Sequence, residues 1–281
     1  MSIKITADST CDLTPELLER YDIGFFPLSV ILGSQSRKDR IEVNPDDLYR
    51  YVASTGELPT TSAISVGEYQ DYFTDLSAKH EAVIHIDISA EFSSCYQNAC
   101  IAAKGFDNVY VVDSRNLSFG HGLIAIEAAQ AAQRGLSAPE IVAYLNDLTG
   151  RVEASFILDQ LSYMVKGGRC SSVTALGANL LKLKPCIEVK DGKMIVGKKY
   201  RGHLDKVLAE YVHDRLHDRD DLNCERIFIA VSSDEPDIFS GLRENVQLYA
   251  SFSEILEARA GCTICSHCGP KAFGILFIRN K

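Results

Sequence analysis

The chain has 281 residues, of which 46% are apolar and 24% charged, a composition typical of a folded globular protein and not of a disordered or fibrous one. Its 29 Lys and Arg residues against 38 Asp and Glu residues give a formal net charge of −9, and no Lys/Arg-rich run gathers the basic residues. These features argue against nucleic acid or an anionic membrane surface as the partner.

We expect a cytoplasmic protein. The longest apolar stretches, residues 23–32 and 123–132, are shorter than the roughly 18 residues that a membrane-spanning helix needs. The N-terminus lacks the charged region and apolar region of a secretory signal. The nine cysteines are scattered along the chain, and we expect most of them to be reduced thiols that pack as small apolar side chains.

The first part of the chain alternates strand signals with helix signals. Short apolar runs at Ile3–Ala7, Ala82–Ile88 and Val109–Asp113 predict strands. Thr14 and Asn44 each precede a proline at the first position of an expected helix. Three further pairs have capping-box spacing, namely Ser65 with Glu68, Ser94 with Gln97, and Ser137 with Glu140. This alternation predicts an α/β fold with a parallel sheet.

The pattern changes near residue 155. Two β-rich runs flank Asp191-Gly192, which is a strong hairpin signal. Beyond it we expect helices over 204–216 and from Pro236, and strands over 226–232, 253–259, 262–267 and 273–279. We therefore predict two domains, an N-terminal α/β domain over residues 1–155 and a C-terminal α+β domain over residues 156–281, with the boundary between 150 and 160.

Hydroxyl and carboxylate side chains follow the expected strands, and ligands bind open α/β sheets outside the carboxyl ends of the strands. Four such clusters occur, at Asp8 to Thr10, Thr60 to Ser62, Ser89 to Ser94, and Asp113 to Ser118. With helix N-termini beside them, they would offer hydrogen-bond donors to a small anion. The same residues are preferred helix caps, so capping alone also accounts for their types.

Sequence motifs for common cofactors and reactions are missing. The chain contains no G-x-x-x-x-G-K-[ST], G-x-G-x-x-G, H-E-x-x-H or G-x-S-x-G pattern, and so shows no ATP site of its own. Cys262, Cys265 and Cys268 have a spacing found in zinc and iron–sulfur sites. The expected nearby fourth ligand is absent, and in the strand that we expect there the thiols would point to alternating faces.

Two arginines lie beside glycines. Arg169 follows Gly167-Gly168, and Arg201 precedes Gly202. Arginines on such turns are suitable ligands for a carboxylate or a phosphate. A surface turn with a solvated charge explains them equally well.

Eight short motifs follow one another along the chain. They are Ala7–Leu13, Thr61–Ser65, Ser89 through Ala99, Val112–Ser114, Gly167–Arg169, Leu181 through Pro185, Tyr200–Gly202 and His267–Pro270. In their order and spacing, which make the match specific, these motifs resemble the DegV family of fatty-acid-binding proteins. The resemblance covers essentially the whole chain.

The resemblance implies an N-terminal α/β domain and a C-terminal domain with a mainly antiparallel sheet, with a long-chain fatty acid held between them. The residues that would bind its carboxylate are Thr61, Ser62, Ser93 and Ser94 from the first domain and His267 from the second. Arg169 and Arg201 would line the head-group mouth or the partner interface.

The resemblance also implies a division of labour between subunits. This chain would supply no catalytic residue, metal ligand or cofactor site, and would present the bound acid to a separate ATP-binding fatty acid kinase subunit that makes an acyl phosphate. Transient peripheral contact with a membrane is compatible with this role.

The chain departs from the family pattern near the expected head-group site. Ala63 and Ile64 replace Gln and Pro, Ser94 and Cys95 replace Gly and Thr, and Lys271 replaces Gly. The larger side chains of Ser94 and Lys271 would narrow the site, and the charge of Lys271 would favour a different anion.

Two alternatives remain open on the residues alone. A hydrolase would use Ser93 as nucleophile and His267 as base, with Asp113 orienting the imidazole, and it requires a hydrogen bond between Ser93 and His267. A metal-binding module would rest on Cys262, Cys265 and Cys268 alone.

Overall fold

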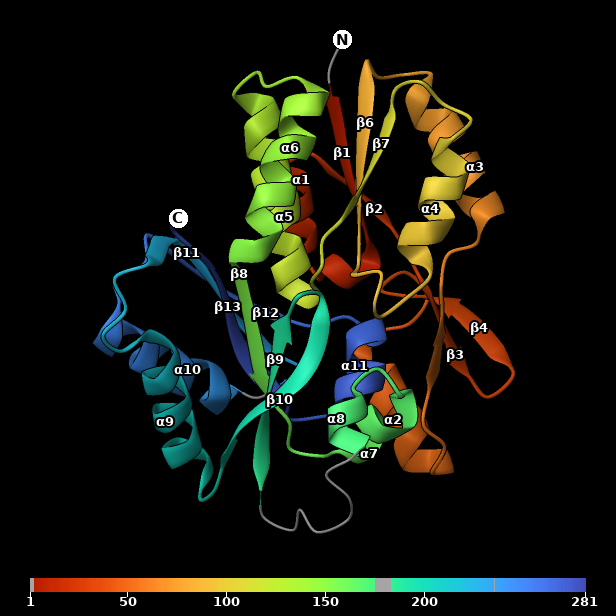
Figure 1. Ribbon diagram of the computed structural model, residues 1–281. Helices are drawn as coiled ribbons and strands as arrows, with labels where there is room; N and C mark the ends of the chain where they lie inside the picture. Colours follow the sequence, from red (N-terminus) through yellow and green to blue (C-terminus); the bar gives the residue numbers. More distant parts are fainter. Residues whose placement is uncertain (1–2, 175–182, 235) are drawn as a thin grey trace.

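The computed structural model describes residues 3–174, 183–234 and 236–281. Within these residues the chain forms a four-stranded sheet and a six-stranded sheet, each with its own helices, and a small three-stranded sheet beside the first (Figure 1). Leu181, in one of the motifs that carry the family resemblance, lies outside the described residues.

The four-stranded sheet is parallel, as the alternation of strands and helices predicts, and has the order β2-β1-β6-β7. Helices α5 and α6 pack on one of its faces, and α3 and α4 pack on the other (Figure 1). The bounds are β1 (Ile3–Asp8), α1 (Pro15–Arg20), β2 (Ile23–Phe26), α3 (Val66–Ser77), β6 (Ala82–Asp87), α4 (Cys95–Ala103), β7 (Val109–Asp113), α5 (Ser118–Gln133) and α6 (Ala138–Leu148).

Most of the predicted helix starts are confirmed. Thr14 and Asn44 accept hydrogen bonds from backbone N–H groups in the first helical turn, and the capping boxes of Ser65 and Ser137 are formed. The predicted box of Ser94 with Gln97 is wrong, because the Ser94 side chain makes no cap hydrogen bond. At the start of α4 it is the Ser93 hydroxyl that accepts from the Cys95 N–H, at 3.2 Å.

The six-stranded sheet is mainly antiparallel, with the order β10-β9-β8-β13-β11-β12. Among the described strands of this sheet, only the neighbours β11 and β12 run parallel. The Asp191-Gly192 hairpin joins β9 to β10, as predicted. The boundary proposed after residue 155 falls inside β8. The bounds are β8 (Val152–Ile157), β9 (Lys184–Lys190), β10 (Lys193–Tyr200), α9 (Leu204–Leu216), β11 (Leu222–Val231), α10 (Pro236–Tyr249), β12 (Glu254–Arg259) and β13 (Phe273–Arg279).

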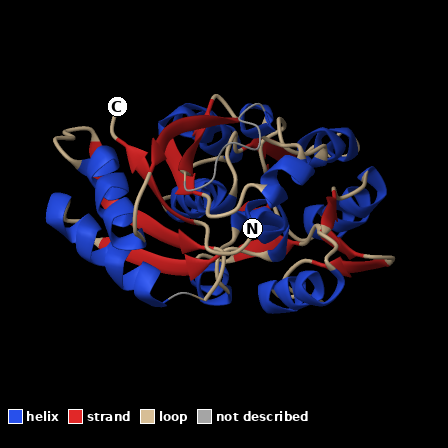
Figure 2. Ribbon diagram, turned by 90° about the horizontal axis from the view of Figure 1, so that it is seen from below, coloured by secondary structure: helices blue, strands red, loops and turns tan. Residues whose placement is uncertain are grey.

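Both faces of this sheet are covered, which explains why its central strands are almost entirely apolar. Phe228 and Leu276 pack on the α5 side, in one core with the parallel sheet. Their neighbours Ile227 and Ile275 pack in a second core with α9 and α10, which cover the other face (Figures 1 and 2). Helix α5 is therefore buried between the two large sheets.

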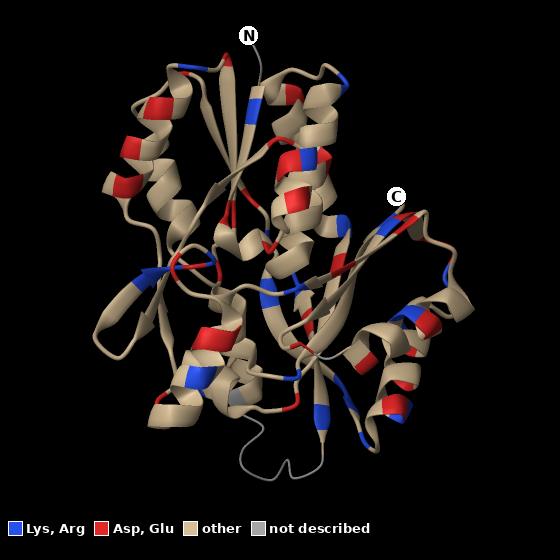
Figure 3. Cartoon of the chain, turned by 180° about the vertical axis from the view of Figure 1, so that it is seen from behind, with Lys and Arg blue, Asp and Glu red and all other residues tan. Residues whose placement is uncertain are grey.

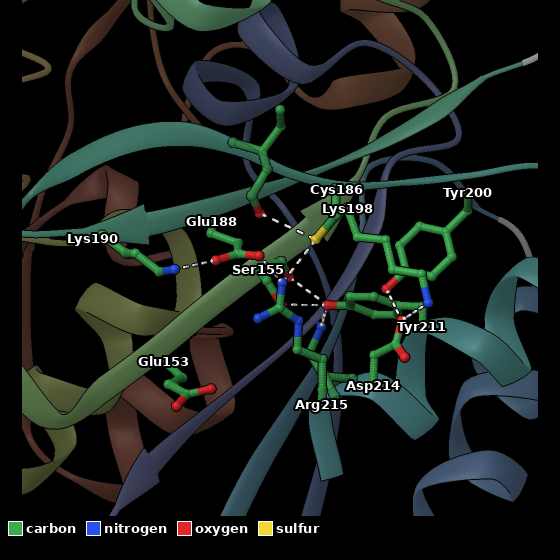
Figure 4. Close-up of polar contacts among 12 residues, drawn as sticks. Glu153, Ser155, Cys186, Glu188, Lys190, Lys198, Tyr200, Tyr211, Asp214 and Arg215 are labelled. Atoms are coloured by element: carbon green, nitrogen blue, oxygen red, sulfur yellow. Dashed lines mark hydrogen bonds and ion pairs between the residues drawn. The ribbon is translucent and has the colours of Figure 1, made fainter. Parts of the chain in front are cut away.

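Helix α9 is attached to the sheet by polar contacts as well as by packing (Figure 4). The buried Tyr211 hydroxyl donates to the Ser155 carbonyl at 2.7 Å and accepts from the Ile275 N–H at 3.0 Å. One turn further on, Arg215 donates to the Glu188 carboxylate at 2.6 Å. These bonds link α9 to β8, β9 and β13.

The three-stranded sheet was not predicted. Its central strand β3 pairs antiparallel with β4 on one side and with β5 on the other, so residues 60–62 form an edge strand and not a loop before a helix. Its strands are short and mixed in polarity, which weakens the period-two signal. The bounds are β3 (Ser29–Leu32), β4 (Gln35–Lys38), α2 (Pro45–Thr55) and β5 (Thr60–Ser62).

The strand expected over residues 262–267 is wrong, because these residues form helix α11 (Cys262–Cys268). The first backbone N–H groups of α11 are buried, and two carboxylates from the start of the chain accept from them. Asp12 accepts from Gly261, and Asp39 accepts from Cys262 and Thr263. These long-range caps override the β-rich local sequence, and α11 packs on α2, β3, β5 and α7.

Short helical elements connect the larger ones. Turns of 3-10 helix lie at η1 (Ser9–Cys11) and η2 (Thr149–Arg151), and the helices α7 (Ser162–Gly167) and α8 (Ser171–Thr174) precede β9. In the described ranges, no helix has the length and apolar character that crossing a membrane requires. Positions of Lys and Arg are interspersed with those of Asp and Glu along the chain (Figure 3).

Candidate functional site

A cavity of about 420 Å³ lies at the carboxyl edge of the parallel sheet, where α11, α7 and β10 approach it. Its polar wall contains most of the residues expected from the sequence, which are Thr61, Ser62, Ser93, Ser94, Arg169 and His267. Its apolar wall includes Leu28, Ile88, Phe92, Met164, Met194 and Ile264. The cavity therefore combines a polar end with a surface suited to an apolar chain.

A smaller apolar cavity of about 40 Å³ shares Leu117, Ile264 and Cys268 with the first. Its other lining residues include Phe156 and Phe273, which belong to the six-stranded sheet. The shared residues show that the two cavities adjoin, so the apolar surface continues from the parallel sheet towards the second sheet.

Thr61 and His267 form the centre of the polar wall. They are 206 residues apart in the sequence, and Thr61 Oγ1 lies 3.0 Å from His267 Nε2. Strand β5 presents Thr61, and helix α11 presents His267. In the tautomer with its proton on Nε2, His267 donates to Thr61, and the Thr61 hydroxyl is then able to donate to a carboxylate.

The other ring nitrogen of His267 is buried, and no described residue hydrogen-bonds to it. Burial, with a smaller contribution from the Arg169 charge, lowers the pKa of His267 to about 4. The imidazole is therefore neutral near pH 7. A side-chain carbon added at Gly167 would lie 2.3 Å from His267 Nδ1, so the first glycine of the Gly167-Gly168-Arg169 motif makes room for this ring.

Sequence reasoning missed several polar residues of the cavity, among them Thr263, Asn98 and the helix cap Ser65. Thr263 lies one turn before His267 on α11, and its buried hydroxyl has no hydrogen-bond partner among the described residues. Asn98 of α4 also lines the cavity, and its amide donates to the Ile64 carbonyl at 2.8 Å. The i, i+4 spacing of Thr263 and His267 signals a shared helical face, but only if α11 is recognised as a helix.

The two arginines have different positions. Arg169 is exposed at the cavity wall, where its guanidinium donates to the Gly167 carbonyl at 2.6 Å. Arg201 is exposed just after β10 and does not line the cavity, so the structure does not place it at the head-group mouth.

The departures from the family pattern also differ in their effect. Ser94 and Ala63 line the cavity, whereas Ile64 and Cys95 are buried behind it. Lys271 is exposed and does not line the cavity. The expectation that Lys271 narrows the head-group site is therefore wrong, because Lys271 lies in the turn after α11, outside the cavity lining.

The geometry does not favour the hydrolase alternative. In the described part of the chain, no hydrogen bond joins Ser93 to His267. The Ser93 hydroxyl contacts Cys95 Sγ at 3.2 Å, and His267 Nε2 faces Thr61. Asp113 accepts from the backbone N–H groups of Ala90 and Arg115.

The cysteine cluster does not have the arrangement of a metal site. Cys262, Cys265 and Cys268 are all buried, and the first two thiols donate to the carbonyls of Val43 and Ser232. Burial raises the pKa of Cys268 to about 12. Over residues 3–174, 183–234 and 236–281, no group of three or more His, Cys, Asp or Glu side chains has a spacing that could hold a metal ion.

Comparison with known proteins identifies the family of this chain. The family model described as "Uncharacterised protein, DegV family" matches residues 2–280. A DegV domain-containing protein of Clostridium acetobutylicum is 32% identical over 280 residues, which is 99% of both chains. Protein DegV of Bacillus subtilis is 34% identical over 199 residues, or 70% of each chain. The chain therefore belongs to the DegV family.

Solved structures agree with this assignment. A fatty-acid-binding DegV family protein from Thermus thermophilus superimposes with a TM-score of 0.90 at 28% identity, covering 99% of this chain and all of that one. A stearic-acid-binding protein from Eubacterium ventriosum superimposes with a TM-score of 0.86 at 26% identity, covering 99% of this chain and 98% of the other.

Proposed function

We propose that this protein binds a long-chain fatty acid in the cavity at the carboxyl edge of the parallel sheet. The observation that carries the proposal is the pairing of Thr61 with His267 at the polar end of a cavity whose other walls are apolar. Solved relatives from Thermus thermophilus and Eubacterium ventriosum bind fatty acids, which supports the same ligand class here.

The carboxylate lies at the polar end, and the chain extends along the apolar wall. The hydroxyls of Thr61, Ser62, Ser93 and Ser94 donate hydrogen bonds to the carboxylate. His267 contributes from the second side of the head group by donating its Nε2 proton to Thr61, which turns the Thr61 hydroxyl hydrogen towards the carboxylate. Holding an anion with neutral donors and exposed Arg169 avoids the high free-energy cost of an unpaired buried charge. The acyl chain contacts Met164, Met194 and Ile264 and continues towards the smaller cavity.

This assignment is tested by native mass spectrometry of the purified protein, followed by extraction and identification of any released lipid. We expect one fatty acid per chain. Thr61→Ala and His267→Ala are expected to weaken palmitate binding about tenfold, because the first removes a hydrogen bond to the charged carboxylate and the second removes the donor that orients the Thr61 hydroxyl. Ser54→Ala, which alters an exposed hydroxyl on α2, is the matched control. Unchanged affinity in both cavity variants would refute the head-group assignment.

We further propose that the bound acid is a substrate for phosphorylation. The protein acts in the cytoplasm as the non-catalytic, substrate-presenting subunit of a kinase system. A separate ATP-binding subunit transfers a phosphoryl group to the bound carboxylate. The missing phosphate-binding motifs support this division, as does the contact of His267 Nε2 with Thr61 in place of a contact with Ser93. Transient contact with a membrane would let the acid enter.

Exposed Arg201, outside the cavity, gives a test of the partner role. Arg201→Ala is expected to leave palmitate affinity unchanged and to slow acyl-phosphate formation several-fold when a bacterial fatty acid kinase subunit and ATP are added, because a charge at the partner interface acts on association. Lys199→Ala, also exposed on this hairpin, is the control. Equal rates for Arg201→Ala and the unchanged protein would remove Arg201 from the interface.

A further inference from the structure

Helix α11 carries His267 and Thr263, but its beginning is held by the N-terminal part of the chain. Asp39 is fully buried. Its Oδ1 accepts from the Cys262 N–H at 2.8 Å, and its Oδ2 accepts from the Thr263 N–H at 3.0 Å. One carboxylate thus satisfies two of the first backbone donors of the helix, where a negative charge is also favoured by the helix dipole.

Asp39 is itself fixed in place. The Ser9 hydroxyl donates to Asp39 Oδ2 at 3.1 Å and accepts from the Leu28 N–H, also at 3.1 Å. The Asp39 N–H donates to the Leu28 carbonyl at 2.9 Å. Three donors therefore converge on the carboxylate, and its backbone is bonded to the residue that precedes β3.

The same small sheet carries Thr61. Strand β3 pairs Ser29 with Lys38 of β4, the residue before Asp39, and pairs Val30 with Thr61 of β5. Thr61 is thus attached to one side of β3, and Asp39 follows the strand on its other side. The three-stranded sheet thus holds Thr61, and through Asp39 it also holds the start of α11. These contacts set the distance between Thr61 and His267, although His267 comes from the far end of the sequence.

We propose that Asp39 is a positioning residue for the head-group site: its carboxylate fixes α11 so that Thr263 and His267 face the cavity and His267 meets Thr61. Asp39 lies outside the cavity lining and acts through the helix. This inference rests on the proposed function, in which the Thr61–His267 pair receives a carboxylate.

Two substitutions of equal size separate this role from general loss of a buried charge. In Asp39→Asn the amide group cannot accept from the backbone donor that it faces, so one helix cap is lost. Asp12 is also fully buried, and it accepts from the Gly261 N–H and the Ser118 hydroxyl. Asp12→Asn preserves both contacts, because the amide oxygen accepts from Gly261 and the amide N–H donates to Ser118. It is therefore the matched control.

The test measures the affinities of palmitate and of hexadecanol, which lacks the carboxylate, for the unchanged protein and the variants. Asp39→Asn is expected to weaken palmitate binding about tenfold and hexadecanol binding by less than twofold. Asp12→Asn is expected to change neither. In a His267→Ala background, adding Asp39→Asn is expected to weaken palmitate binding by less than about twofold, because only the position of Thr263 is then left to change.

The outcomes distinguish this inference from the proposed function. If His267→Ala leaves palmitate binding unchanged, the head-group assignment itself fails. If His267→Ala weakens binding and Asp39→Asn does not, or if Asp39→Asn weakens palmitate and hexadecanol equally, the positioning role is overturned. Should Asp39→Asn not fold, Ser9→Ala removes one of the three donors and is expected to weaken palmitate binding two- to threefold. No change in that variant would also overturn the role.

Discussion

At the scale of single residues, the protonation state of His267 is set by its surroundings. The pKa of His267 is lowered from 6.5 to about 4, first by burial and second by the Arg169 charge. In the unfolded chain the imidazole takes up a proton as the pH falls through 6.5, whereas the folded chain does not until about pH 4. Folding stability contributed by this residue is therefore present above pH 6.5 and is lost as the pH falls towards 4.

This pH dependence gives a prediction for the protein without ligand. Between pH 6.5 and pH 4, the free energy of unfolding of the unchanged protein is expected to fall by on the order of 2 kcal/mol more than that of His267→Gln, since one pKa unit corresponds to about 1.4 kcal/mol and partial exposure reduces the effect. Denaturant unfolding at several pH values measures it. His217→Gln, at an exposed position, is the control, and parallel pH curves for the unchanged protein and His267→Gln would contradict the prediction.

At the scale of elements, α9 depends on the hydroxyl of Tyr211. This group makes three hydrogen bonds, to the Ser155 carbonyl, the Ser155 hydroxyl and the Ile275 N–H. Tyr211→Phe is expected to lower the free energy of unfolding by about 1–3 kcal/mol, because it leaves buried polar groups of β8 and β13 unpaired. Thermal or urea unfolding measures the change. Tyr249→Phe, which keeps the ring contacts with His213 and His217, is the control, and equal losses in the two variants would argue against the prediction.

Elements with local signals were predictable, and elements that depend on distant residues were not. The three parallel strands and the caps at Thr14 and Asn44 follow from the chain within a few residues. Helix α11 does not, because Asp39 lies 223 residues before the Cys262 N–H that it accepts from. Its β-rich segment therefore predicted a strand.

The same distinction holds within the site. Thr61, Ser93 and His267 were identified through the family resemblance, and the structure brings them to one cavity. Thr263 was not predicted as a site residue, because it shares a face with His267 only when residues 262–268 form a helix, and a strand was expected there. Arg201 was grouped with Arg169 because both lie beside glycines in the sequence. The path of β10 places Arg201 outside the cavity, whereas Arg169 lines it.

At the scale of the whole molecule, the two large sheets share one core through α5. Phe119 of α5 is fully buried and stacks on Phe228 of β11, with ring centroids 4.8 Å apart. Phe119→Ala is expected to lower the free energy of unfolding by about 3–5 kcal/mol. Leu248→Ala, at a position that is 73% exposed, is the control and is expected to leave the free energy of unfolding nearly unchanged. Urea unfolding measures both values.

Because this core is shared, we expect both sheets of the Phe119→Ala variant to unfold in one transition. Hydrogen exchange of the β1 and β13 amides as a function of denaturant measures this directly. Exchange of β13 at much lower denaturant than β1 would show that the sheets unfold separately.

The position of β13 also bears on how the molecule forms during synthesis. This strand lies between β8 and β11, but the ribosome makes it after both of them, and α11 emerges just before it. Until these segments leave the exit tunnel, α5 lacks the part of its covering that β13 supplies, and the carboxylates of Asp12 and Asp39 lack the backbone donors at the start of α11. The nascent chain therefore acquires a complete binding cavity only after nearly all of these 281 residues have been translated.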